Sequence, residues 1–359
     1  MESLKYLLLP LKWIALILSF LYRRDHNISL FGADNRSFSN NSKYKFLEIT
    51  GDLRGDEKVF WVTRSKSLAV KNADLGNFVY LYSVNGILLC LRAQFYYYNC
   101  YVSDITVWLS GGATKINLWH GMPIKEIEYL ISHGPMRIVY NPESKKEKFI
   151  SALRYLVNPG PRTKPDILLS ESQFFVEIMA ESFRIPQDKV HVQQSSRVKY
   201  LKQQIRTVKP SNRILYLPTF RGAGILSLVK LMVEQLDACL LQRIDIKPHP
   251  NDYIYINEIA KIYPNLKFVC NQDVYDLIPK YKNYVTDISS LIFDLELICR
   301  PYYIYFPDIY IYSKSNRGFI FNVEELFGVE NIRHDFNDIF RDIHESKVCR
   351  YERVGRMIE

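Results

Sequence analysis

The sequence lacks the signatures of several common nucleotide- and metal-dependent enzymes. No Gly-x-Gly-x-x-Gly follows a predicted strand and there is no phosphate-loop lysine, which disfavours both a Rossmann dehydrogenase and a P-loop ATPase. It also has no Asp-x-Asp pair and no cysteines at zinc-ligand spacing. We therefore expect neither a protein-bound metal nor a cofactor.

Cysteine is sparse and unpatterned. The six cysteines lie singly, mostly within apolar runs, at positions 90, 100, 239, 270, 299 and 349. This pattern favours reduced, buried thiols of a cytosolic protein over a disulfide framework.

A long, uninterrupted hydrophobic run is also missing. Residues 4–22 are strongly apolar, but Pro10 and Lys12 interrupt them, and the remainder, Trp13–Tyr22, is shorter than the roughly 20 residues of a spanning helix. No small-residue cleavage site follows, so a signal peptide is not expected. Aromatic ends and basic flanks favour an interfacial helix, with a spanning segment or a soluble packing helix as alternatives. We predict that residues 1–26 associate with a membrane.

Acidic residues are fewer than basic ones, with 38 Asp and Glu against 47 Lys and Arg. The net charge of +9 indicates an anionic partner, either nucleic acid, anionic lipid or a phosphorylated substrate. No nucleic-acid-binding module is recognisable, so we do not expect nucleic acid. A chain of 359 residues is long enough for about two domains, which we place at 27–200 and 201–359.

The first half alternates strand and helix patterns, which predicts an α/β sheet. Residues 85–99 have the spacing of a helix. The last predicted strand runs directly into His120, which places this histidine at the carboxyl end of a strand, where parallel sheets bind ligands. The predicted strands are Asn27–Phe31, Val59–Thr63, Phe78–Tyr82, Ile105–Leu109 and Ile116–Trp119.

Residues 131–165 interrupt this alternation with a basic and apolar insertion. A surface helix with a solvated charged face is one interpretation. A second membrane contact is the other.

In the second half, a polar segment at 199–212 resembles an inter-domain linker, and the strand–helix alternation then restarts. Residues 284–299 predict a strand, a polar turn and a capped helix. Three strand ends carry cationic, hydroxyl or carboxylate groups that we expect at one edge of a sheet, around a helix start that suits a diphosphate. These are Thr219 and Arg221, then Lys247 and His249, then Asp287, Ser289 and Ser290. Each also has a purely structural interpretation, as a cap, a turn residue or a solvated charge.

Several motifs stand in an order that resembles the CDP-glycerol glycerophosphotransferase family, which includes teichoic-acid primases and polymerases and related capsule enzymes. The resemblance covers roughly residues 28–328. The motifs are Phe31–Asp34, Asn41–Tyr44, Leu118–Lys125, Ile214–Arg221, Lys247–Pro250, Val285–Ser290, Arg300-Pro301 and Arg317-Gly318.

The resemblance implies a GT-B fold, with two Rossmann-like α/β domains facing a central cleft, the first for the acceptor and the second for the donor. It implies transfer of glycerol phosphate from CDP-glycerol to a lipid-linked or glycan acceptor, with release of CMP. His120 would be the general base, a task that suits a histidine pKa near 6.5. His249 would contact the diphosphate and assist the departing CMP. The other expected donor-binding residues are Thr219, Arg221, Lys247, Asp287, Ser289, Ser290 and Arg317.

One segment departs from the family pattern. Where the family carries a Gly-x-Pro-Arg-x-Asp turn, this chain has Gln194–Lys199, in which only the arginine remains. A relative that uses CDP-ribitol or another activated donor, or an inactive membrane-bound scaffold, is therefore an alternative. We expect a peripheral protein on the cytoplasmic face of the cell membrane, held by anionic lipid.

Overall fold

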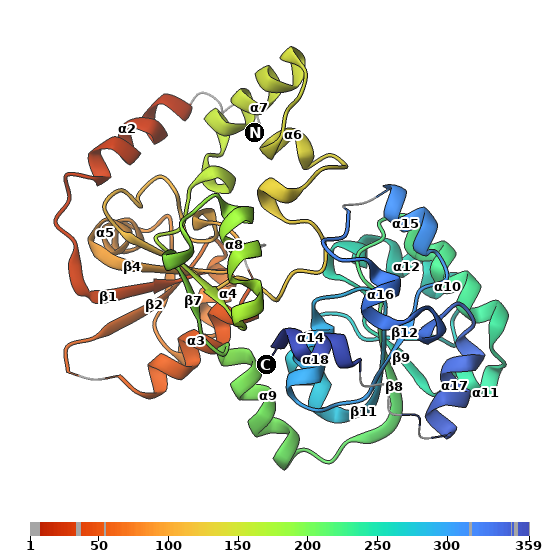
Figure 1. Ribbon diagram of the computed structural model, residues 1–359. Coiled ribbons are helices and arrows are strands. Elements are labelled where there is room, and N and C mark those ends of the chain that lie inside the picture. The colour runs from red at the N-terminus through yellow and green to blue at the C-terminus, as the bar shows by residue number, and fades with distance from the viewer. Residues whose placement is uncertain are drawn as a thin grey trace. The chain divides into compact units, whose positions relative to one another are not determined.

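The computed structural model describes residues 8–33, 37–53, 55–315, 318–345, 347 and 351–358. The chain divides into two compact units (Figure 1). One holds the residues up to His120 together with Ile127–Arg197, and the other holds Gly121–Glu126 together with the chain from Val198 onward.

The first unit is built on a seven-stranded sheet whose paired strands are all parallel. The strand order is β3-β2-β1-β4-β5-β6-β7. The strands are β1 (Asp25–Phe31), β2 (Lys58–Thr63), β3 (Phe78–Tyr80), β4 (Ala93–Tyr98), β5 (Thr114–Asn117), β6 (Ile167–Ser170) and β7 (Val190–Val192). The helices are α2 (Leu9–Ser19), α3 (Asn40–Gly51), α4 (Lys66–Lys71), α5 (Val84–Arg92), α6 (Arg137–Tyr140), α7 (Lys145–Val157) and α8 (Val176–Phe183).

A hydrophobic cluster covers each face of this sheet, and successive residues of a strand point to opposite faces. Tyr96 and Tyr98 of β4 enter the cluster that also contains residues of α5. Tyr97 points the other way, toward the cluster that contains Phe46 of α3, where its ring stacks on Phe31 with 4.5 Å between centroids.

The strand prediction was wrong around β4. Residues 85–99 are not one helix, because α5 ends at Arg92 and β4 starts at the next residue. The predicted strand Ile105–Leu109 is an irregular buried segment whose backbone bonds to arginines instead of strands. Arg64 donates to the carbonyls of Ser103 and Ile105, and Arg24 donates to that of Leu109.

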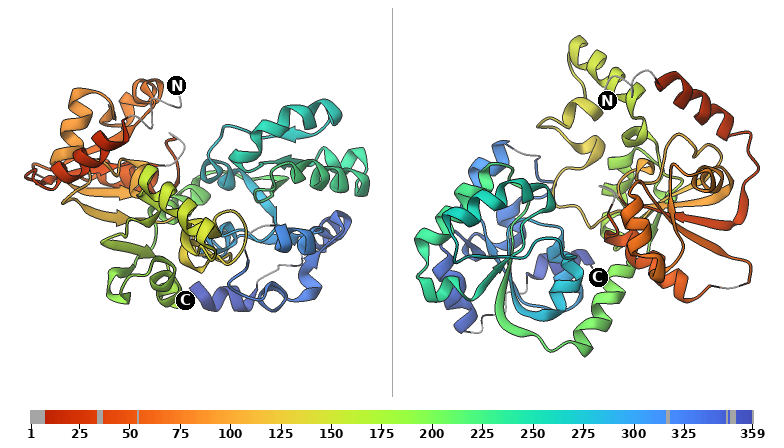
Figure 2. Two further views of the ribbon diagram at one scale, coloured as in Figure 1. Left: turned by 90° about the horizontal axis from the view of Figure 1, so that it is seen from above. Right: turned by 180° about the vertical axis from the view of Figure 1, so that it is seen from behind.

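The second unit contains a six-stranded sheet of parallel pairs in the order β10-β9-β8-β11-β12-β13. Its strands are β8 (Ser211–Leu217), β9 (Ile244–Ile246), β10 (Lys267–Phe268), β11 (Tyr281–Thr286), β12 (Tyr302–Tyr305) and β13 (Ile332–Arg333). Helices flank both faces of the sheet (Figure 1, Figure 2). They are α10 (Gly224–Gln235), α11 (Ala238–Leu241), α12 (Tyr253–Ile262), α13 (Val274–Leu277), α14 (Leu291–Leu297), α15 (Ile309–Ser315), α16 (Val323–Phe327), α17 (Phe336–His344) and α18 (Glu352–Ile358).

The segment at 199–212, predicted as an inter-domain linker, is mostly the helix α9 (Ser196–Thr207), and the chain passes from one unit to the other within this helix. The predicted strand, turn and helix at 284–299 are confirmed, although α14 ends at Leu297.

The N-terminal apolar segment forms the short helix α2, which packs on the first unit. The Ser19 hydroxyl accepts a hydrogen bond from the Gly111 amide at 2.9 Å, and the Trp13 indole donates to the Leu156 carbonyl of α7 at 3.0 Å. None of the helices in the described ranges combines the length and the apolar character that crossing a bilayer requires.

Five cysteines fall within the described residues, and all five are free thiols. Cys90 is buried, as expected, but Cys239 and Cys299 are exposed, which corrects the expectation for those two positions.

Candidate active site

The polar strand ends of the second half lie at neighbouring positions on one edge of the second sheet. Thr219 follows β8, Lys247 follows β9 and Asp287 follows β11. Because β9, β8 and β11 are adjacent and parallel, their carboxyl ends meet at the same edge. The structure therefore brings these predicted residues together within one unit.

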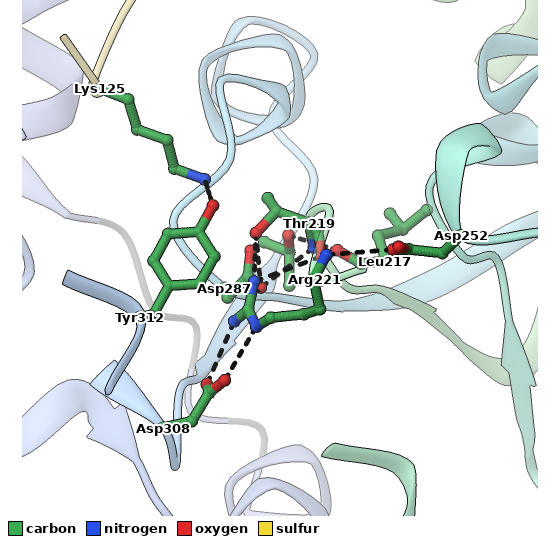
Figure 3. Close-up of polar contacts among 9 residues, drawn as sticks. Lys125, Leu217, Thr219, Arg221, Asp252, Asp287, Asp308 and Tyr312 are labelled. Atoms are coloured by element: carbon green, nitrogen blue, oxygen red, sulfur yellow. Dashed lines mark hydrogen bonds and ion pairs between the residues drawn. The ribbon is translucent and has the colours of Figure 1, made fainter. Parts of the chain in front are cut away.

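Arg221 is the centre of a buried ion network at this edge (Figure 3). Its side chain is 3% exposed, and it lies 2.8 Å from an Asp287 carboxylate oxygen and 2.9 Å from one of Asp308. The amide and hydroxyl of Thr219 donate to the same Asp287 oxygen at 3.0 and 2.9 Å. In this structure the charges of Arg221 and Asp287 therefore balance each other.

Electrostatics and stacking both hold the Arg221 guanidinium in place. Burial disfavours its charge, but the carboxylates of Asp287 and Asp308 outweigh burial and raise the pKa of Arg221. The guanidinium carbon lies 4.1 Å from the centroid of the Tyr312 ring, and the Tyr312 hydroxyl accepts from the Lys125 amine at 2.8 Å.

Asp252 supports the turn that carries Arg221. Its carboxylate accepts from the backbone amides of Arg221 and Gly222 at 3.2 and 2.8 Å (Figure 3). Burial raises the pKa of Asp252, and the two backbone hydrogen bonds oppose that rise.

The sequence predictions omitted four members of this network: Lys125, Asp252, Asp308 and Tyr312. A signal existed for Asp308, because Asp308 also follows a strand of this sheet, β12. No comparable signal marks Tyr312, which lies in helix α15.

His249 presents a defined tautomer in its neutral form. Its Nδ1 accepts a hydrogen bond from the Asn251 amide at 3.2 Å, so the ring proton is assigned to Nε2. That nitrogen is then a hydrogen-bond donor. The neighbouring Lys247 is only 6% exposed, and its amine donates to the Tyr253 hydroxyl.

The serines stand at the start of α14. Ser290 is the N-cap residue and makes no side-chain capping bond, while the Ser289 hydroxyl accepts from the Leu291 amide at 3.3 Å. Both serines are half-buried. The remaining predicted donor residue, Arg317, lies outside the described residues.

His120 belongs to the first unit. It is exposed and lies three residues beyond the end of β5. Its imidazole packs on the Trp119 indole with 4.3 Å between centroids, and its Nδ1 lies 3.6 Å from the Cys100 sulfur.

The segment that departs from the family pattern spans the boundary between the units, with Gln194–Arg197 in the first unit and Val198 and Lys199 in the second. Arg197, 1% exposed, forms a buried ion pair with Glu171, and the Ser196 hydroxyl donates to Glu48 at 2.5 Å. The retained arginine is thus a buried partner of a carboxylate. Within the described ranges, no group of three or more His, Cys, Asp or Glu side chains is arranged to hold a metal ion.

Curated relatives cover much of the chain at low identity. It is 28% identical over 269 residues to a teichoic acid ribitol-phosphate primase of Bacillus spizizenii, covering 66% of this chain and 63% of that protein, which is less than two thirds of its length. It is 26% identical over 335 residues to a teichoic acid poly(glycerol phosphate) polymerase of the same organism, covering 86% of this chain and 81% of the relative.

A solved structure shares the fold. The wall teichoic acid polymerase TagF aligns with a TM-score of 0.67 and 19% identity, covering 99% of this chain and 89% of that one. This confirms the α/β class with two parallel sheets. The family model described as CDP-Glycerol:Poly(glycerophosphate) glycerophosphotransferase matches residues 14–355, and the chain belongs to that family.

Proposed function

We propose that this protein transfers glycerol phosphate from CDP-glycerol to a hydroxyl group of a lipid-linked or glycan acceptor, in the synthesis of a teichoic-acid-like or capsular polymer. The observation that carries the proposal is the family match over residues 14–355. The relatives named as poly(glycerol phosphate) polymerases, and a TagF structure soaked with CDPG, support CDP-glycerol as the donor.

The chemistry is a displacement at phosphorus. The acceptor oxygen attacks the phosphorus that bears glycerol, a new P–O bond forms, and the P–O bond to CMP breaks. His120 takes the proton of the acceptor hydroxyl, which makes the attacking oxygen more nucleophilic. The electron pair of the broken bond leaves with CMP.

The second unit would hold the donor. The Nε2–H of His249 can donate to a diphosphate oxygen and stabilise the charge that develops on CMP. Lys247 and the hydroxyls of Ser289 and Ser290 provide further cationic and donor groups at the same edge. Arg221 would act through the network that shapes this edge, because its charge is already balanced by Asp287 and Asp308.

The test measures release of the nucleotide in the presence of lipid acceptors: CMP from CDP-glycerol or CDP-ribitol, and UDP or UMP from UDP-sugars. The proposal expects CDP-glycerol to be used preferentially. Preference for CDP-ribitol would support the alternative suggested by the ribitol-phosphate primase of Bacillus spizizenii. Turnover of no donor would favour an inactive scaffold.

Loss of the His249 imidazole should weaken use of the donor. We expect His249→Ala to reduce kcat/KM for CDP-glycerol by roughly 10- to 150-fold, because a hydrogen bond to a charged group contributes about 1.5–3 kcal/mol. His334→Ala, which removes an exposed histidine of the same unit, should have little effect. Native kinetics in His249→Ala would remove this residue from the donor site.

We also propose that the protein is peripheral on the cytoplasmic face of the cell membrane, held by helices α2 and α7. The two helices contact each other through Trp13, whose ring also packs 5.9 Å from that of Tyr155. Together they expose an apolar surface flanked by basic side chains, which suits an anionic lipid interface. Its exposed apolar residues are Leu11, Ile14, Ile17, Leu18, Phe149, Leu153, Leu156 and Val157, and exposed basic residues of α7 are Lys145, Lys146, Lys148 and Arg154.

Polar substitution on α2 tests this membrane contact. The triple variant Leu11→Ser, Ile17→Ser, Leu18→Ser should bind less to vesicles containing anionic lipid, because it removes exposed apolar area without touching the packed face. Deleting the whole segment would also disturb the packing of the first unit, since Ser19 is fully buried and Arg24 donates to core carbonyls.

The matched control is Ile254→Ser, Ile262→Ser, at exposed isoleucines of α12 in the other unit. It should sediment with vesicles like the native protein. Equal sedimentation of the α2 variant and the control would contradict the proposed anchor.

A further inference from the structure

The residue before His120 has a strained backbone. Trp119 has φ +49°, in the left-handed region, where a side chain other than glycine costs about 1–2 kcal/mol. Such a conformation persists only where the surroundings enforce it. The peptide groups on both sides of Trp119 are indeed held by buried side chains.

Two asparagines hold these peptide groups. Asn41, at the start of α3 and 4% exposed, donates from Nδ2 to the carbonyls of Leu118 and Trp119 at 3.1 and 2.7 Å. Asn117, 1% exposed, accepts from the Trp119 amide at 2.8 Å and donates to the Cys100 carbonyl at 3.1 Å. The carbonyl bonded at 2.7 Å belongs to the peptide that leads directly into His120.

Asn41 is itself fixed to the sheet. The amide of the next residue, Ser42, donates at 2.9 Å to the side chain of Asn99, which is fully buried directly after β4. The adjoining Cys100 carries the sulfur that lies 3.6 Å from the His120 ring. The strap Leu118–His120 is therefore tied to α3, β4 and β5 by side-chain hydrogen bonds.

We propose that Asn41 is a positioning residue for His120: by holding the carbonyls of Leu118 and Trp119, it fixes the direction in which the imidazole presents its proton-accepting nitrogen. This inference rests on the proposed function, in which His120 is the base. Asn41 would not contact either substrate, and its effect would pass entirely through the orientation of His120.

Asn41→Ala should lower kcat by roughly 10- to 100-fold, because a displacement of about 1 Å in a reacting group can cost that much. KM for CDP-glycerol should stay within about twofold, since the donor residues belong to the other unit. Asn41→Leu keeps the branching at Cγ but has no polar atoms. It should show the same lowered kcat with unchanged KM, and it guards against poor folding of the alanine variant.

The decisive measurement is a double-mutant comparison. In a His120→Ala background, Asn41→Ala should reduce kcat no further, because the group it positions is already gone. Asn141→Ala is the control: this side chain also donates to two loop carbonyls, those of Tyr129 and Ile131, at 2.8 and 3.0 Å. It should leave kcat within about twofold of native. An equal loss from Asn41→Ala in both backgrounds would overturn the proposal in favour of a general structural role.

A second readout does not require activity. In protein labelled with 13C-histidine, the His120 ring signal, assigned by its loss in His120→Ala, should carry a ring-current shift from Trp119. Asn41→Ala should reduce that shift, whereas Asn141→Ala should preserve it. If no donor is turned over but the shift changes as expected, the proposed function fails and the positioning contact stands. An unchanged shift in Asn41→Ala would overturn the positioning contact.

Discussion

Replacing His120 with alanine should lower turnover by roughly 10²–10⁴-fold, the usual contribution of a general base. The expectation follows from an exposed imidazole held beside Trp119 on a strap fixed by buried side chains. Affinity for CDP-glycerol should change little, because the residues expected to bind the donor lie in the other unit. Single-turnover kinetics with saturating CDP-glycerol separate the chemical step from donor binding.

The pH dependence gives an independent check of the same role. A protonated imidazole cannot accept the acceptor proton, so native turnover should fall as the pH drops through the range in which histidine ordinarily titrates, near pH 6.5. This acidic limb should be absent from the residual activity of His120→Ala. The control, His133→Ala, removes another exposed first-unit histidine and should retain both the rate and the limb. Near-native turnover in His120→Ala would assign the base to a different group.

Arg221→Ala should lower the free energy of unfolding by about 3–5 kcal/mol, because it leaves the buried carboxylate of Asp287 without its counter-charge. The guanidinium also bonds to Asp308 and stacks on Tyr312, so its removal opens a space at the centre of the site edge. Urea unfolding followed by circular dichroism measures this loss.

The control is Lys230→Ala, which breaks an exposed ion pair with Glu234 in the same unit. Exposed pairs contribute about 0–1 kcal/mol, so stability should barely change. If Arg221→Ala instead kept native stability and lost affinity for CDP-glycerol, Arg221 would be a direct ligand of the donor rather than the core of an ion network. A loss of stability would support the ion network seen in the structure. A loss of donor affinity alone would support the charge clamp predicted from the sequence.

Hydrophobic patterning was sufficient to predict the class of fold. Strands such as β2 and β12 are compact apolar runs, and their alternation with helices indicated parallel sheets. It failed at Arg92–Ala93, where α5 runs into β4 without a glycine or proline to separate them. It failed again at Ile105 and Val107, which are buried outside any strand because arginine side chains satisfy the local backbone.

Chemistry-bearing strand ends were predictable, but their partners were not. Thr219, Lys247 and Asp287 each follow a strand, and parallel topology alone places such residues at one edge. Pairing is different, since the Thr219–Asp287 bond spans 68 residues and the Arg221–Asp308 pair spans 87. Nothing local in the sequence states that the charge of Arg221 is balanced within the protein. That information exists only once the strands are assembled.

The second unit contains two separate stretches of the chain, one of which is the six residues that follow His120. Gly121–Glu126 belongs to that unit, where Lys125 pairs with Phe319 and the Glu126 amide donates to the Gly318 carbonyl at 2.8 Å. The polypeptide consequently crosses between the units three times: after His120, after Glu126 and after Arg197. A fragment that begins at Val198 would lack the amine that bonds to Tyr312 and the segment that covers Gly318. The second unit is thus not a transferable module, and no single cut of the chain can release it whole.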